Sequence, residues 1–86
     1  MKMNGKLFKG PVVLANAGCE VPDSIGGYQD RLERLLVMVS HELGASVPMW
    51  LSKNTREYVQ FRRTSFGGDQ FFDPVLFDRM EIRVEE

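Results

Sequence analysis

The stretch YQDRLERLLVMVSHELG, from Tyr28 to Gly44, decides the fold because it carries the most regular pattern in the chain. Its apolar residues recur at spacings of four, three, one, three and four: Tyr28, Leu32, Leu35, Leu36, Val39 and Leu43. This spacing fills one arc of about 100° on an α-helix. Asp30 suits the positive amino end of the helix dipole, His41 suits the carboxyl end, and Gly44 can end the helix in the left-handed conformation. We therefore predict one long amphipathic helix.

Strand patterns lie on both sides of this helix. Residues 6–15 alternate weakly and contain β-branched valines, and Gly10-Pro11 interrupts them, so they form either an edge strand or a hairpin. The glycine, proline, aspartate and serine residues between Asn16 and Gly27 favour turns and predict a loop. After Pro74, apolar and charged residues alternate in a final strand that includes Leu76, Met80, Ile82 and Val84 on one face.

A second, shorter helix is predicted after Trp50. Asn54 with Glu57 three residues later has the form of a capping box, which starts a helix at Thr55 that runs to about Arg63. Residues 47–54 either continue the helical turn upstream or form a hairpin. The helices and strands together predict a single α+β domain over residues 1–86. It has a small antiparallel sheet, built from the N-terminal strand or hairpin and the C-terminal strand, with both helices on one side.

Composition limits the classes of protein to consider. The chain has 86 residues, 43% of them hydrophobic and 27% charged, which predicts a folded protein with one modest core. Its single cysteine excludes an intramolecular disulfide and favours a reducing cytoplasm. The longest apolar run, Leu35 to Val39, is far shorter than the roughly 20 residues of a membrane span. We expect a cytoplasmic protein that is not inserted in a membrane.

Charge is unevenly distributed along the chain. Residues 1–43 are neutral, residues 44–68 carry four cations against one carboxylate, and residues 69–86 carry two cations against six carboxylates. On a helix through this basic region, Lys53, Arg56 and Arg63 line up on one face with Arg62 beside them. These four residues are the candidate polyanion-binding site, since such a stripe can contact phosphates. The overall charge of −1 makes nucleic acid less expected than an acidic protein surface.

Seven of the nine aromatic residues lie between Trp50 and Asp78, and core packing is their default role. Adjacent Phe71 and Phe72 cannot both point inward, and Phe77 falls on the charged face of its expected strand. Val37 projects opposite the apolar arc of the long helix. We therefore predict an interface at Val37, Phe72 and Phe77, with a protein partner or a second copy of the chain.

Cys19 and His41 are the only thiol and the only imidazole, so a thiol enzyme remains a formal alternative. Cys19 is predicted to be chemically ordinary, because Glu20 beside it disfavours a thiolate. The acidic residues near the carboxyl end lack the spacing of a calcium loop, and no glycine pair has the context of a phosphate cradle. We expect no metal and no cofactor.

The runs W-L-x-K-N-T-R-E at Trp50–Glu57, F-x-x-T-x-F at Phe61–Phe66, Q-F at residues 70–71 and V-x-F-D at residues 75–78 resemble an uncharacterised family of short bacterial proteins. The resemblance covers the carboxy-terminal half of the chain and implies a bacterial origin and a shared fold. It implies no activity. The function we expect is that of a small non-enzymatic interaction or assembly protein, with weak nucleic-acid binding and thiol chemistry at Cys19 as the alternatives.

Overall fold

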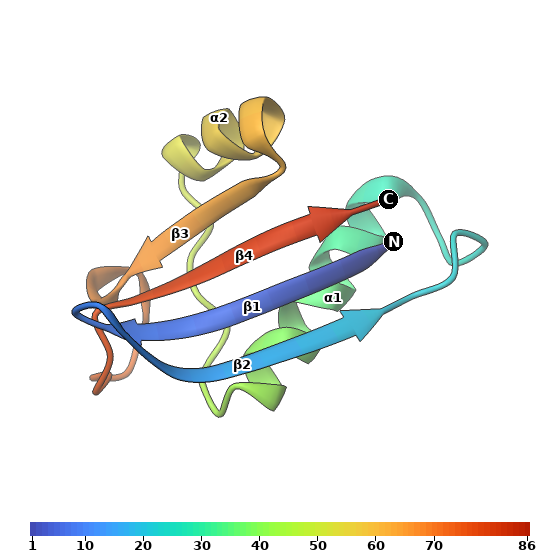
Figure 1. The fold of residues 1–86 in the computed structure, drawn as a ribbon. Helices are drawn as coiled ribbons and strands as arrows, with labels where there is room; N and C mark the ends of the chain where they lie inside the picture. The colour runs from blue at the N-terminus through green and yellow to red at the C-terminus, as the bar shows by residue number, and fades with distance from the viewer.

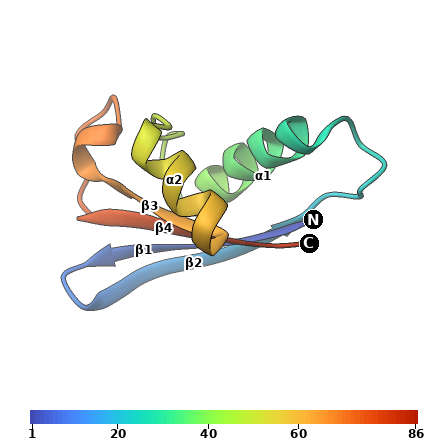
Figure 2. The same ribbon diagram turned by 90° about the horizontal axis from the view of Figure 1, so that it is seen from above.

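The computed structural model describes all 86 residues, which form a four-stranded antiparallel sheet with both helices on one of its faces (Figures 1 and 2). The elements are β1 (Lys2–Lys9), β2 (Val12–Glu20), α1 (Tyr28–Glu42), α2 (Ser52–Phe61), β3 (Arg63–Gly67), a 3-10 turn η1 (Gly68–Gln70) and β4 (Arg79–Glu85). The strand order β2-β1-β4-β3 puts the first and last strands side by side in the middle of the sheet. The predicted α+β class is confirmed.

The amino-terminal segment is a hairpin, which resolves the choice between one edge strand and two strands. Lys9 pairs with Val12 across the two-residue loop Gly10-Pro11. Gly10 has a φ of 55°, and proline fixes a negative φ after it, as the two central positions of a II′ hairpin turn require. The register shifts once: Leu7 pairs with Ala15 and Phe8 with Val13, so Leu14 is left as a bulge.

The loop predicted over residues 16–27 is wrong for its first part, because β2 continues to Glu20. Lys2 pairs with Glu20, so β1 also begins earlier than the alternating pattern suggests. The residues of β2 that face α1 are small: Ala15, Ala17 and Cys19, all partly buried against the core. Small side chains suit a strand that lies close beneath a helix, and they give little hydrophobic periodicity to read.

The core lies between the helices and one face of the sheet, as the edge-on view shows (Figure 2). Alternate strand residues point into it, chiefly Met3, Leu7, Phe66, Met80, Ile82 and Val84. The helix α1 meets them with the predicted apolar arc, of which Leu35, Leu36, Val39 and Leu43 are buried. Gly44 follows the helix with a φ of 75°, which confirms its predicted role as the helix stop. Neither helix has the length and apolar character that crossing a membrane requires.

The second helix begins and ends earlier than predicted. Leu51 occupies the N-cap position and Asn54 lies three residues later, so Asn54 is not the cap residue. Its side-chain oxygen accepts a hydrogen bond from the Leu51 amide at 2.9 Å, the part of a capping box that the sequence assigned to Glu57. Residues 45–51 form neither a helix nor a hairpin. The helix stops at Phe61 because Arg62 is left-handed, with a φ of 56°, and the chain turns directly into β3.

The final strand is also shorter than predicted. It begins at Arg79, and the residues before it are irregular, so the alternation does not extend back to Leu76. Leu76 is 90% exposed. Phe77 instead packs edge-on against buried Phe71, with ring centroids 5.1 Å apart. Phe77 is therefore partly buried, and Phe72 is the exposed one of the two phenylalanines.

Candidate functional site

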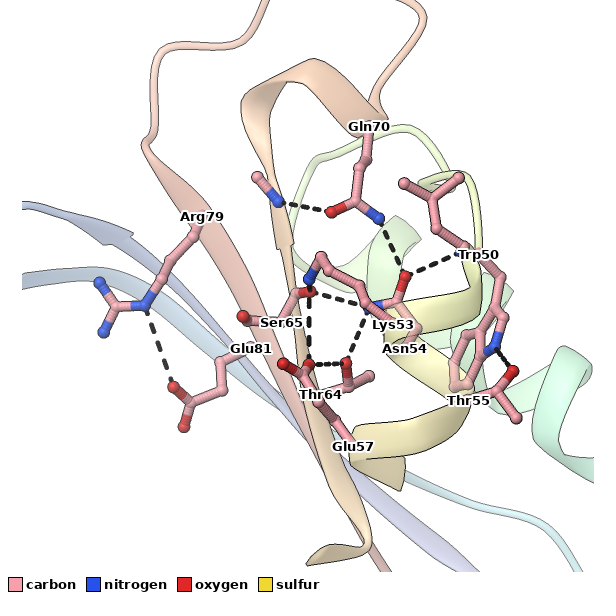
Figure 3. Close-up of polar contacts among 12 residues, drawn as sticks. Trp50, Lys53, Asn54, Thr55, Glu57, Thr64, Ser65, Gln70, Arg79 and Glu81 are labelled. Atoms are coloured by element: carbon pink, nitrogen blue, oxygen red, sulfur yellow. Dashed lines mark hydrogen bonds and ion pairs between the residues drawn. The ribbon is translucent and has the colours of Figure 1, made fainter. Parts of the chain in front are cut away.

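The most extensive polar cluster in the protein centres on Asn54, which is completely buried (Figure 3). Its amide nitrogen donates to the Thr64 hydroxyl at 2.7 Å and to the Ser65 carbonyl at 2.9 Å. Its amide oxygen accepts from the Leu51 amide at 2.9 Å and from the Gln70 side chain at 3.0 Å. All four hydrogen-bonding positions of the asparagine are filled by the protein itself. A saturated group of this kind fixes structure and offers nothing to a ligand.

Gln70 and Glu57 extend this cluster at either end. The Gln70 side chain donates to the Met49 carbonyl at 2.9 Å and accepts from the Gly67 amide at 3.1 Å. The Thr64 hydroxyl donates to Glu57 at 2.6 Å. The cluster thus joins residues 49–51, α2, β3 and η1.

A pH-dependent part of the stability comes from Glu57. The Thr64 hydroxyl holds the pKa of the Glu57 carboxyl below its ordinary value, with further help from Lys53. A lowered folded-state pKa stabilises the protein above the unfolded value, about 4.3, and the gain is lost as the pH falls through the folded-state pKa. We expect Glu57→Gln to be less stable than the parent to urea at pH 7, and the difference to shrink below about pH 4. A difference that is the same at both pH values would contradict this origin.

The four residues predicted to bind a polyanion do not share one helix face. Arg56 is exposed on α2, whereas Lys53 donates to the Ser65 carbonyl at 2.7 Å. Arg62 ends the helix, pairs with Glu86 at 3.8 Å and lies over the Tyr58 ring. Arg63 belongs to β3. The four residues do not form a stripe because α2 ends at Phe61, before Arg62. Arg62 and Arg63 therefore turn away from the helix face that carries Arg56.

The three predicted interface residues are also dispersed. Val37 is 52% exposed on α1, and Phe72 is 85% exposed in the loop that follows η1. Their exposure was predicted correctly. Phe77 is partly buried and packs against Phe71.

An apolar cleft of about 430 Å³ separates the two helices. Leu32, Leu36, Trp50 and Val59 contribute to its lining. Three of its polar groups already have partners: the two hydroxyls of Tyr28 and Tyr58 hydrogen bond to each other, and the Trp50 indole donates to Thr55 at 2.9 Å. Burial, and then the Tyr28 hydroxyl, raise the pKa of Tyr58, so its phenol stays neutral. Gln29 and Glu33 also line the cleft, and their side chains form no hydrogen bond or ion pair within the protein.

Cys19 lies in β2 on the side that faces the core, not in a loop. Burial and then the Glu42 carboxylate raise the pKa of its thiol. A raised pKa is the opposite of what activates a thiol nucleophile, which agrees with the expectation of an ordinary cysteine. No group of three or more His, Cys, Asp or Glu side chains converges as metal ligands.

The two edges of the sheet differ sharply. At the β3 edge, the Ser65 carbonyl is covered by two side chains of α2, Lys53 at 2.7 Å and Asn54 at 2.9 Å. At the β2 edge, no side-chain hydrogen bond reaches the backbone of Val12–Glu20, which pairs only with β1. The first eight residues of β2, VVLANAGC, contain no charge and no proline. Three apolar side chains there are about half exposed: Val12, Val13 and Leu14.

The sheet face opposite the helices is uncovered (Figure 2). Its residues can be read as rows across the strands from the register, because directly paired residues share a face. One row is Gly18, Asn4, Arg83 and Arg63; the next is Asn16, Lys6, Glu81 and Ser65. All of these residues except Ser65 border a hollow of about 340 Å³.

No protein-family description, curated protein or solved structure matches this chain.

Proposed function

We propose that this chain is a small interaction protein that assembles by strand pairing along β2, and that its partner is a second copy of itself. The observation that carries the proposal is the bare β2 edge, a nine-residue strand whose first eight residues lack charge and proline. Long, flat apolar edges invite pairing with another strand. Proteins that stay apart blunt such edges with lysine, proline, β-bulges or a covering helix, as α2 does at β3. The strand β2 has one such bulge, at Leu14, and its residues from Ala15 to Glu20 are regular.

The strand is compatible with itself. An antiparallel pairing about a two-fold axis through the middle of β2 places Asn16 opposite Asn16 of the second copy, and Ala15 opposite Ala17. Glu20, the only charged residue of β2, then lies opposite Val12 and meets no like charge. Residues 15–17 form the regular centre of this pairing, and the bulge at Leu14 falls just outside it, opposite Gly18 of the second copy. Two four-stranded sheets would join into one sheet of eight strands.

The proposal is tested by a substitution that adds a negative charge to β2. The charge should leave the single chain stable and destabilise the dimer. Asn16 is exposed and pairs directly with Lys6 on β1, so Asn16→Glu places opposite charges together within one chain. In the dimer, two glutamates would face each other across the axis. We expect Asn16→Glu to weaken dimerisation about fivefold or more, measured by sedimentation velocity, because one such repulsion costs about 1 kcal/mol.

Asn16→Gln is the matched control, because it keeps the shape and polarity of the glutamate without its charge. It should dimerise like the parent. Equal association of both variants would remove β2 as the interface, and circular dichroism should show that both retain the fold.

The two alternatives have less support. A polyanion site on a helix face loses its basis, since its residues lie on separate elements. A thiol enzyme at Cys19 would need a lowered thiol pKa, and the neighbours of Cys19 raise it. The single cysteine continues to favour a reducing cytoplasm.

A further inference from the structure

Two arginines lie directly opposite each other on the uncovered face of the sheet. Arg63 of β3 pairs with Arg83 of β4, and both side chains are exposed. Directly opposed residues have Cβ atoms about 5 Å apart, and like charges at that distance destabilise a sheet. The positive charges of Arg63 and Arg83 therefore repel each other, although other surface positions could have held them.

Neither arginine is neutralised by a carboxylate. The ion pairs of the protein involve the terminal amino group with Asp23, Lys53 with Glu57, Arg62 with Glu86, and Arg79 with Glu81. Arg63 leans on the Phe61 ring, 5.9 Å from its centroid, which holds the guanidinium without satisfying its charge. The planar forks of both arginines remain open to an acceptor.

The surroundings of the pair add further donors. Arg83 lies next to Asn4 in its row, and Lys6 of the next row also borders the 340 Å³ hollow. At the far end of the row, Gly18 has no side chain, and an added Cβ there would come within 2.8 Å of the Asn4 amide oxygen. Glycine therefore leaves room for the Asn4 side chain to lie along the sheet. The hollow has guanidinium, ammonium and amide donors in one place.

We propose that this hollow binds a compact oxyanion of the phosphate type, held between Arg63 and Arg83 with Lys6 and Asn4 at its side. A dianion bridging the two guanidinium groups would replace their repulsion by charge-assisted hydrogen bonds. Glu81 and Glu85 also border the hollow, in the rows on either side of Arg83, so a chain of phosphates running across the face would have to pass over a carboxylate, whereas a single phosphate group over the arginines would not. This favours a terminal phosphate group over the backbone of a nucleic acid.

The test is a titration of the protein with sodium phosphate, followed by the NMR signals of the arginine side chains and backbone amides, against sodium chloride at matched ionic strength. We expect phosphate alone to shift the signals of Arg63 and Arg83, with a dissociation constant in the millimolar range. The double variant Arg63→Gln, Arg83→Gln should bind at least about tenfold more weakly, because each arginine contributes a charge-assisted hydrogen bond. Both side chains are exposed, so the variant should keep its fold.

The matched control removes the same charge elsewhere. Arg34→Gln with Arg56→Gln alters two exposed arginines on the helices and should leave phosphate binding unchanged. Equal shifts with chloride, or equal loss in the control, would overturn the site.

A single-stranded oligonucleotide without a terminal phosphate is the second probe. Stronger binding of this oligonucleotide at these signals would overturn the compact ligand in favour of a nucleic-acid backbone. All residues of the proposed phosphate site belong to a single chain. The site therefore does not need the dimer, and phosphate can bind even if the protein does not dimerise.

Discussion

Asn54→Ala is expected to destabilise the protein by about 3 kcal/mol, because the change opens a void at a fully buried site and removes four hydrogen bonds at once. The Leu51 amide loses its side-chain acceptor, and the amino end of α2 is released from β3. For a chain of this size, the loss corresponds to a fall of about 15 °C in melting temperature. Thermal and urea unfolding followed by circular dichroism measure it.

Gln60→Ala is the control in the same helix. Gln60 is exposed and forms no side-chain hydrogen bond, so the change should alter stability by less than about 0.5 kcal/mol. If the two variants had the same free energy of unfolding, the hydrogen bonds of Asn54 would not be what holds α2 against the sheet.

Gly5→Ala is expected to be the second large effect. Gly5 lies in β1 directly beneath α1, where an added Cβ would come within 2.4 Å of the Val39 side chain and 3.1 Å of that of Leu43. Valine is branched at Cβ and cannot swing aside within a helix, so the helix must move. Overpacking of this kind costs about 2 to 3 kcal/mol, which chemical unfolding should show.

Gly18→Ala is the matched strand control. A Cβ at Gly18 meets only the end of the Asn4 side chain, on the uncovered face, where that side chain can rotate away. It should cost less than about 0.5 kcal/mol. Equal losses from both glycine substitutions would mean that close packing of α1 on β1 is not the cause.

The parts of the fold that were predictable are those whose periodicity is local. A short window of sequence is enough to predict the apolar arc of α1, the end of that helix at Gly44, and the alternation from Met80 to Val84. The second half of β2 was missed because Ala17 and Cys19 are small and partly buried, so they read as a loop. Its strand character comes from pairing with β1, which no short window of sequence contains.

The candidate sites depend even more on distant pairing. Asn54 resembles a cap residue in sequence, yet its partners Thr64 and Gln70 come from β3 and η1. Arg63 was assigned to a helix face, and only the register with β4 brings it opposite Arg83. The exposed β2 edge follows from the strand order, which the sequence left open. Composition could indicate an unusual charge distribution but not where those charges meet.

The central claim, self-assembly through β2, is tested most directly by the mass of the unaltered protein in solution. We predict that sedimentation equilibrium from micromolar to submillimolar concentration gives the mass of two chains at the upper end, with dissociation on dilution. The mass of one chain throughout that range would contradict the account.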